Sequence, residues 1–203
     1  MGPPDQREVG FVLVVGFAAG PFRTNCYLLA AGTDRRCVVV DPGQDAREGV
    51  RKALREHGLT PEGVLATHGH ADHVATAGEL AAEHGVPVWI HPGDAELLGA
   101  PARDLADGDT LRLAGLEIDI VHTPGHTPGS VIFRLGTDEG GRVVLSGDTL
   151  FAGSVGRGDQ RVLAASLRDK LMTLPDDTVV LPGHGQPTTI GRERPLVTGA
   201  AAR

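Results

Sequence analysis

The sequence THGHADH, residues 67–73, places three histidines and an aspartate within six positions. It overlaps the end of a short apolar run, Val64–Thr67, that is typical of a buried strand, and it precedes a periodic apolar pattern that predicts a helix over Val74–His84. In α/β proteins, reactive groups collect where strands end. Nitrogen and carboxylate donors without thiolates suit zinc, iron or manganese. The segment therefore predicts a metal centre at the end of a strand.

Three further segments offer a ligand candidate directly after a predicted strand. PGHTPG at residues 124–129 contains His126, SGDT at residues 146–149 contains Asp148, and PGHG at residues 182–185 contains His184. Their glycines allow the backbone to approach an ion closely. A closed structural zinc site needs four ligands and favours cysteine, whereas Cys26 and Cys37 lie in apolar runs and are expected to be buried reduced thiols. The surplus of histidine and aspartate favours a catalytic site over a structural one.

The other apolar runs indicate how these segments are held. Strands are predicted at Phe11–Phe17, Asn25–Ala31, Cys37–Val40, Val86–Ile90, Thr110–Leu113, Leu116–Val121, Val131–Leu135, Val143–Ser146 and Thr178–Leu181, and helices at Arg47–His57 and near Val162–Met172. Strands first and alternating strand–helix units afterwards predict a layered α/β architecture. No linker divides the pattern, so we expect a single domain over residues 1–203.

Composition narrows the range of partners. The formal net charge is -7 and aromatic residues make up only 3% of the chain, which disfavours a nucleic-acid partner. No segment approaches the roughly 20 apolar residues that a membrane-spanning helix needs, so no membrane partner is expected. The residues before Phe11 include Asp5 and Glu8 instead of a positive cluster, which disfavours an export signal and favours a cytoplasmic location.

Taken together, THGHADH, PGHTPGS, SGDTLFAGS and LPGHG resemble the metallo-β-lactamase superfamily, in particular its small glyoxalase II-like members, the hydroxyacylglutathione hydrolases. The resemblance covers nearly the whole chain, because NCY at residues 25–27 and VDPG at residues 40–43 are similar to that family's opening strands. It implies an α/β fold of four layers, an αβ/βα sandwich, with the metals at one rim.

The resemblance also implies a role for each candidate. It assigns one ion to His68, His70 and His126 and a second ion to Asp72, His73 and His184, with Asp148 bridging the two, so that Asp72 and Asp148 are the catalytic carboxylates. The expected cofactors are two divalent metal ions, zinc first, with iron or manganese as alternatives. Asp41 either steadies the histidine loop as an outer carboxylate or simply forms a turn.

The implied activity is hydrolysis of a small-molecule thioester, such as a 2-hydroxyacyl glutathione. A water that two ions share has its pKa lowered from 15.7 toward about 7, and the resulting hydroxide needs no protein base. Because thiolate is a good leaving group, no strong general acid is required. The sequence says nothing about the oligomeric state.

Three departures from the family pattern concern the substrate. The chain ends soon after His184, so the C-terminal helical glutathione-binding domain of larger members is not expected. GRGD at residues 156–159 runs directly into a predicted helix without the usual Pro-Gly-containing loop, and the segment between His91 and Leu105 is short. Arg157 either binds an acidic end of the substrate or packs against the neighbouring loop.

Other functions remain open. A persulfide dioxygenase of the same superfamily would use one iron, for which His68, His126 and Asp148 form a suitable facial set. Lactone hydrolysis is a third alternative, whereas a β-lactamase, a nuclease and a non-catalytic metal-binding module are disfavoured. Among the remaining histidines, His91 and His122 lie near strand ends where they could line the pocket.

Overall fold

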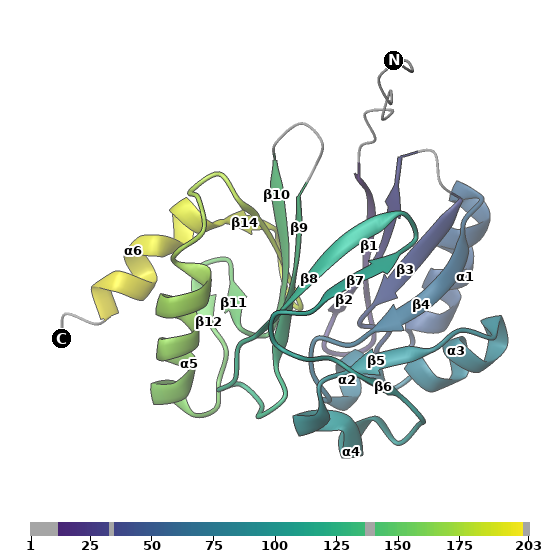
Figure 1. Cartoon of the computed structure of the whole chain (residues 1–203), viewed down its shortest axis with the longest axis horizontal. Helices are drawn as coiled ribbons and strands as arrows, with labels where there is room; N and C mark the ends of the chain where they lie inside the picture. Colours follow the sequence, from purple (N-terminus) through teal and green to yellow (C-terminus); the bar gives the residue numbers. More distant parts are fainter. Residues whose placement is uncertain (1–11, 33–34, 137–140, 201–203) are drawn as a thin grey trace, which may run out of the picture.

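The computed structural model describes residues 12–32, 35–136 and 141–200. Two six-stranded sheets form the centre of the molecule and face each other (Figure 1). The first sheet contains, in spatial order, β1 (Val12–Ala19), β2 (Thr24–Ala31), β3 (Arg36–Val40), β4 (Thr60–Leu65), β5 (Val88–Ile90) and β6 (Arg103–Asp104). The second contains β14 (Thr188–Thr189), β13 (Val179–Pro182), β10 (Arg142–Gly147), β9 (Val131–Gly136), β8 (Leu116–His122) and β7 (Thr110–Leu113). The predicted start of the first strand, Phe11, lies outside the described residues.

Helices cover the outer face of each sheet. In Figure 1, α1 (Ala46–His57) and α3 (Ala77–His84) lie outside the first sheet, and α5 (Gln160–Ser166) and α6 (Ile190–Ala200) lie outside the second. A π-helical turn, Leu167–Leu171, continues α5. The short elements are α2 (Ala71–Val74), a 3₁₀ turn at Pro92–Asp94, α4 (Ala95–Leu98) and the hairpin of β11 (Leu150–Phe151) and β12 (Ser154–Val155).

The alternation of side chains along the strands explains the layering. In β2, Cys26 and Leu28 pack against the helices of the first sheet, while Tyr27 and Leu29 pack against the second sheet. Successive residues of a strand point to opposite faces, so an apolar run such as this one is buried on both sides. A third apolar cluster joins Val144 of β10 to Leu163 of α5. Three apolar layers between four structural layers confirm the predicted αβ/βα sandwich.

Two helices differ from the prediction. The helix expected over Val74–His84 is divided, because the backbone N–H of Thr76 donates to Pro42 O (3.1 Å) and its hydroxyl donates to the same oxygen (2.9 Å). Helix α6 was not predicted, since its sequence contains Pro195 and has little apolar periodicity. Glu193 holds it in place by accepting hydrogen bonds from Thr188 Oγ1 and Gly153 N.

Within the part of the chain that the structure describes, no helix is both long enough and apolar enough to cross a membrane.

Candidate metal centre

The sandwich brings together the ends of strands from both sheets. The loops that follow β4, β8, β10 and β13 carry THGHADH, His126, Asp148 and His184 respectively. The first loop belongs to the first sheet and the other three belong to the second sheet. All seven candidate ligands therefore meet where the two sheets approach each other, although they span more than 110 positions of sequence.

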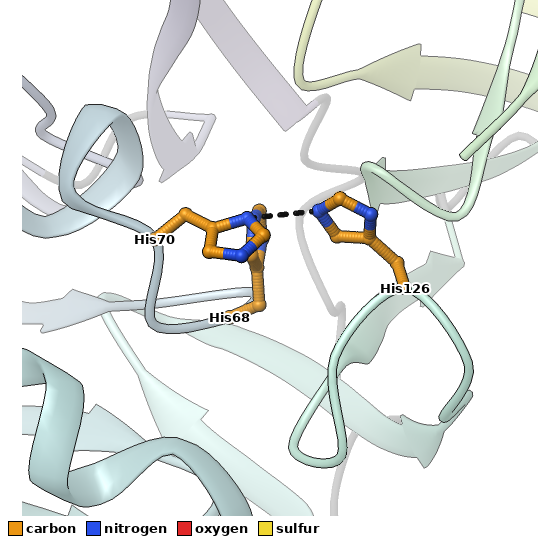
Figure 2. Close-up of side chains that lie close together, drawn as sticks. All are labelled: His68, His70 and His126. Atoms are coloured by element: carbon orange, nitrogen blue, oxygen red, sulfur yellow. Dashed lines mark hydrogen bonds between the residues drawn. The ribbon is translucent and has the colours of Figure 1, made fainter. Parts of the chain in front are cut away.

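Three imidazoles form the first group. His68 Nε2 lies 3.1 Å from His70 Nδ1, and His126 Nε2 lies 3.0 Å from the same His70 nitrogen. Figure 2 shows that His68 and His70 come from one loop and that His126 reaches them from an opposite loop. The ligand atoms of these residues all lie within 4.8 Å of one another.

The second group contains Asp72, His73 and His184. Two imidazole nitrogens, His73 Nε2 and His184 Nε2, lie 3.4 Å apart, and His184 Nε2 lies 3.3 Å from Asp72 Oδ2. The hydroxyl of Thr24 donates a hydrogen bond to Asp72 Oδ2 (3.0 Å) and orients this carboxylate. The helix α2 places Asp72 and His73 next to each other at its start, as predicted from the sequence.

Asp148 lies between the two groups. Its Oδ2 is 3.5 Å from His126 Nε2 in the first group and 3.5 Å from His184 Nε2 in the second, and its Oδ1 is 3.3 Å from His73 Nε2. Oδ1 is buried and has no hydrogen-bond partner among the residues that the structure describes. A buried carboxylate oxygen without a hydrogen bond is costly unless a cation compensates it.

The donors around the centre fit metal ions. Two nitrogens that each lie about 2.1 Å from a tetrahedral ion are about 3.4 Å apart, and the nitrogen pairs within the two groups are 3.0–3.4 Å apart. A Cβ atom at Gly183 would overlap Asp148 Oδ1 and lie 2.6 Å from His73 Cε1, so only glycine leaves the space beside the shared carboxylate free.

Outer hydrogen bonds fix the tautomers of four histidines. The Nδ1 atoms of these rings contact Thr67 Oγ1 for His68 (3.2 Å), Asp41 Oδ2 for His73 (2.9 Å), Arg157 O for His126 (2.8 Å) and Phe22 O for His184 (3.1 Å). The carbonyl and carboxylate oxygens can only accept, and the Thr67 hydroxyl already donates to Asp41, so each Nδ1 carries the proton. The Nε2 lone pairs of all four rings therefore point into the centre, as metal ligation requires.

Asp41 supports the centre from outside and also occupies a turn. It has a left-handed φ of 51° and is buried. Its Oδ1 accepts from Thr67 N (2.7 Å), and its Oδ2 accepts from Thr67 Oγ1 (2.6 Å) and His73 Nδ1 (2.9 Å). Asp41 therefore both forms a turn and holds the histidine loop in place, which the sequence had left as alternatives.

We expect Asp41→Asn to weaken metal binding about 10- to 100-fold, because loss of an outer carboxylate loosens the orientation of a ligand histidine. Competition with a chromogenic chelator measures this affinity. Asp45→Asn is the matched control, since Asp45 also has a left-handed φ (60°) but is exposed and its side chain makes no capping hydrogen bond. Equal affinities of both variants would show that Asp41 does not support the ligands.

Asp94 is a structural contributor that the sequence did not reveal. Only 1% of this residue is exposed, and its carboxylate accepts hydrogen bonds from Gly69 N (2.9 Å), Thr127 Oγ1 (2.6 Å) and Gly129 N (2.8 Å). It therefore ties the loop of His68 and His70 to the loop of His126. The HPGD stretch in which it lies has the composition of an ordinary turn, so its only signal was proximity in sequence to a strand end.

The carboxylates of the centre favour the protonated forms of two of its histidines. Burial opposes a charge on His73, but the neighbouring Asp41 and Asp148 carboxylates outweigh it and raise the pKa of His73 to about 10. Hydrogen bonding to Asp148 and Asp72 raises the pKa of His184 to about 9. In turn, the hydrogen bond from His184 holds the pKa of the Asp72 carboxyl well below its usual range. In the metal-free protein both histidines thus carry a second proton, on Nε2, near neutral pH, and this proton must leave before the Nε2 lone pair can bind a metal.

Metal binding is therefore expected to release about two protons at pH 7, because a ligating imidazole must be neutral. The affinity should rise with pH until the pKa values of His184 (about 9) and His73 (about 10) are passed. Calorimetric titration in two buffers of different ionisation enthalpy measures the proton release. An affinity that does not change between pH 7 and pH 10 would contradict this expectation.

His91 and His122 belong to none of the groups of candidate ligands found among the described residues. Their rings stack at 4.1 Å with an interplanar angle of 9°, and His122 Nε2 lies 2.8 Å from Pro128 O. Cys26 and Cys37 are buried free thiols, as predicted, and burial raises the pKa of Cys37 to about 12.

Comparison with known sequences places this arrangement in a family. A family model described as the metallo-β-lactamase superfamily matches residues 19–184. An uncharacterized protein of Mycobacterium leprae is 43% identical, over 90% of this chain and 96% of its own length. The probable metallo-hydrolase YqgX of Bacillus subtilis is 35% identical (86% and 91%), and the hydroxyacylglutathione hydrolase GloC of Haemophilus influenzae is 34% identical (85% and 91%).

Solved structures agree with the sequence matches. BLEG-1, a B3 metallo-β-lactamase, superposes with a TM-score of 0.78 at 34% identity, covering 92% of this chain and all of its own. TTHA1623 in a di-iron-bound form gives 0.77 at 37% identity (89% and 97%), and ETHE1 from Myxococcus xanthus gives 0.81 at 30% identity (92% and 85%).

Two facing sheets that present a cluster of histidines and carboxylates at their strand ends define a metallo-hydrolase of the α/β sandwich class. The chain belongs to the metallo-β-lactamase superfamily.

Proposed function

We propose that this metallo-hydrolase cleaves thioesters at a centre of two metal ions. The position of Asp148 carries the proposal: one carboxylate lies within 3.5 Å of imidazole nitrogens from both three-residue groups. A site for a single ion would need only one of these groups. The second group is assembled as closely as the first, with its ligand atoms also within 4.8 Å of one another.

In this proposal His68, His70 and His126 hold one ion, Asp72, His73 and His184 hold the other, and Asp148 binds both. Two bound ions would lower the pKa of a shared water and polarise the substrate carbonyl. The protein fixes the direction of the Nε2 lone pairs of four histidines, because the Nδ1 atom of each ring is held by a hydrogen bond to a neighbouring oxygen. It also contributes Gly183, whose lack of a side chain leaves room beside the shared carboxylate.

Zinc is the metal that we propose first. Imidazole and carboxylate donors suit zinc, iron and manganese alike, and the spacing of the nitrogens agrees with the bond lengths of zinc. The di-iron-bound form of TTHA1623 supports iron as the alternative occupant of the same ligands.

The thioester preference is supported by similarity and by leaving-group chemistry. GloC, which this chain matches over 91% of its length, is a hydroxyacylglutathione hydrolase. A thiolate leaves without strong protonation, so its departure asks for no strong general acid at the centre. The centre is therefore better suited to a thioester than to an amide with a poor leaving group.

A persulfide dioxygenase is the second candidate, because ETHE1 from Myxococcus xanthus superposes with a TM-score of 0.81. That chemistry would use one iron held by His68, His126 and Asp148. It leaves Asp72, His73 and His184 without a metal to bind, which is why we rank it below the hydrolase.

A panel of substrates distinguishes these candidates. The zinc-loaded protein is assayed with S-lactoylglutathione, a γ-lactone and a β-lactam, and the iron-loaded protein is assayed for oxygen consumption with glutathione persulfide. We expect turnover of the thioester at least about 100-fold above that of the lactone and the β-lactam, since the thiolate is the best leaving group. Oxygen consumption with the persulfide and no thioester cleavage would replace the hydrolase with the dioxygenase.

A further inference from the structure

The turn between β1 and β2 is fastened to the loop that carries His184. Phe22 O accepts a hydrogen bond from His184 Nδ1 (3.1 Å). The side-chain amide of Asn25 donates to Pro182 O and to Gly185 O, each at 2.9 Å, and Thr24 pairs with His184 as an isolated β-bridge. The turn is therefore held in a fixed position at the edge of the metal centre.

A cavity of about 370 Å³ opens between these two segments. Its walls are formed by Ala18, Phe22, Arg23, Asn25, Gly185 and Gln186. Gly185 follows His184 directly, so the cavity borders the second group of ligands. A substrate whose carbonyl lies at the centre would extend one of its arms into this space.

The lining of the cavity combines a cation with an apolar wall. Phe22 is 68% exposed, the highest value among the exposed large hydrophobic residues of the described chain. The side chain of Arg23 is exposed and makes no ion pair with any described residue, whereas Arg47 and Arg51, on the nearby helix α1, are both paired with Glu83. Its backbone adopts a left-handed φ of 54°, an uncommon conformation for a residue other than glycine.

We propose that this cavity binds a carboxylate-bearing arm of the substrate, with Arg23 pairing with the carboxylate and Phe22 covering the apolar part of the arm. A guanidinium binds a carboxylate through two parallel hydrogen bonds. A planar aromatic side chain contributes contact area at low cost in conformational entropy. Arg23 is thus the residue that would make the protein prefer thioesters of a carboxylate-bearing thiol to those of an uncharged thiol.

This inference rests on the proposed function, because the arm is defined relative to a thioester carbonyl at the metal centre. A subsite at Arg23 would distinguish substrates by the charge of their thiol, whereas the metal centre alone would not. A thioester of an uncharged thiol has no carboxylate for Arg23, so the two kinds of substrate should respond differently when Arg23 is changed.

Steady-state kinetics with two thioesters test the assignment. The substrates are S-lactoylglutathione, whose thiol carries carboxylates, and S-lactoyl-N-acetylcysteamine, whose thiol is uncharged. We expect Arg23→Ala to raise KM for the first about 10-fold, the usual effect of losing a hydrogen bond to a charged group. The value of kcat should stay within about twofold, KM for the uncharged substrate should not change, and Arg23→Lys should restore part of the loss.

Arg142→Ala is the matched control, because Arg142 is an exposed arginine at the start of β10, the end of the strand away from Asp148. Equal effects of Arg23→Ala on both substrates, or no effect on either, would overturn the subsite.

Calorimetric binding of S-hexylglutathione, a thioether that cannot be hydrolysed, separates this inference from the proposed function. Binding that weakens about 10-fold in Arg23→Ala but not in Arg142→Ala supports the subsite even if the wild-type protein cleaves neither thioester, an outcome that would refute only the thioester activity. Equal binding by the wild type and Arg23→Ala would refute the subsite while leaving any measured thioester cleavage standing.

Discussion

Asp148→Ala is expected to lower kcat for thioester hydrolysis at least about 10³-fold while the fold persists, because removing a group that stabilises the transition state has effects of this size. Asp148 is the residue whose carboxylate approaches both groups of ligands. Its Oδ1 has no hydrogen-bond partner among the described residues and lies 3.3 Å from His73 Nε2. The variant loses the contacts of this carboxylate with His73 and His184 and the metal that it helps to hold, so we expect its melting temperature to fall to about that of the metal-free wild type. The expected result is therefore loss of turnover in a protein that still unfolds in one cooperative transition.

The measurements are kcat, metal content per chain and the thermal unfolding transition followed by circular dichroism. Asp177→Ala serves as the control, because Asp177 is an exposed aspartate that precedes β13 at the end of the strand opposite His184. Wild-type turnover by a metal-depleted Asp148→Ala protein would refute the two-ion centre.

Removal of metal by a chelator is expected to abolish hydrolysis and to lower the melting temperature by on the order of 10 °C. A ligand present at 1,000 times its Kd stabilises the folded state by about 4 kcal/mol, and in a chain of this size each kcal/mol shifts the melting temperature by roughly 2–4 °C. The physical reason is that Asp72 and Asp148 lose the cations that balance their charges.

Activity and melting temperature should both return when zinc is added, which separates loss of metal from damage to the protein. The Asp148→Ala variant provides the comparison, since chelation should change its melting temperature less than that of the wild type. Full hydrolysis in the presence of excess chelator, with metal analysis confirming removal, would be incompatible with a metal-dependent enzyme.

The sequence predicted best the apolar strands and the histidines and aspartates that directly follow them. The order of strands and helices along the chain predicted a layered α/β architecture, and the apolar run around Tyr27 and Leu29 is buried on both faces of its sheet. The positions of His126, Asp148 and His184 after strands followed from simple punctuation by proline and glycine. The structure brings these three residues together with the THGHADH loop, as the resemblance implied.

The parts that were not predicted depend on contacts between distant segments. Asp94 contacts the backbone at Gly69 and Gly129, which lie 25 and 35 positions away, and nothing local marks it. The division of the predicted helix at Thr76 depends on Pro42, which belongs to another strand end. The cavity at Arg23 lies between the turn that precedes β2 and the loop that follows β13, which belong to different sheets and are joined by the hydrogen bonds of Asn25.

The most direct test of the two-ion centre is a titration of the metal-free protein with zinc, in which S-lactoylglutathione hydrolysis and bound metal are followed together. We predict that two ions bind per chain and that activity rises until the second equivalent is bound, because Asp148 serves both groups. Full thioester hydrolysis after one equivalent, or activity that appears only with one iron and consumes oxygen with a persulfide, would contradict the account.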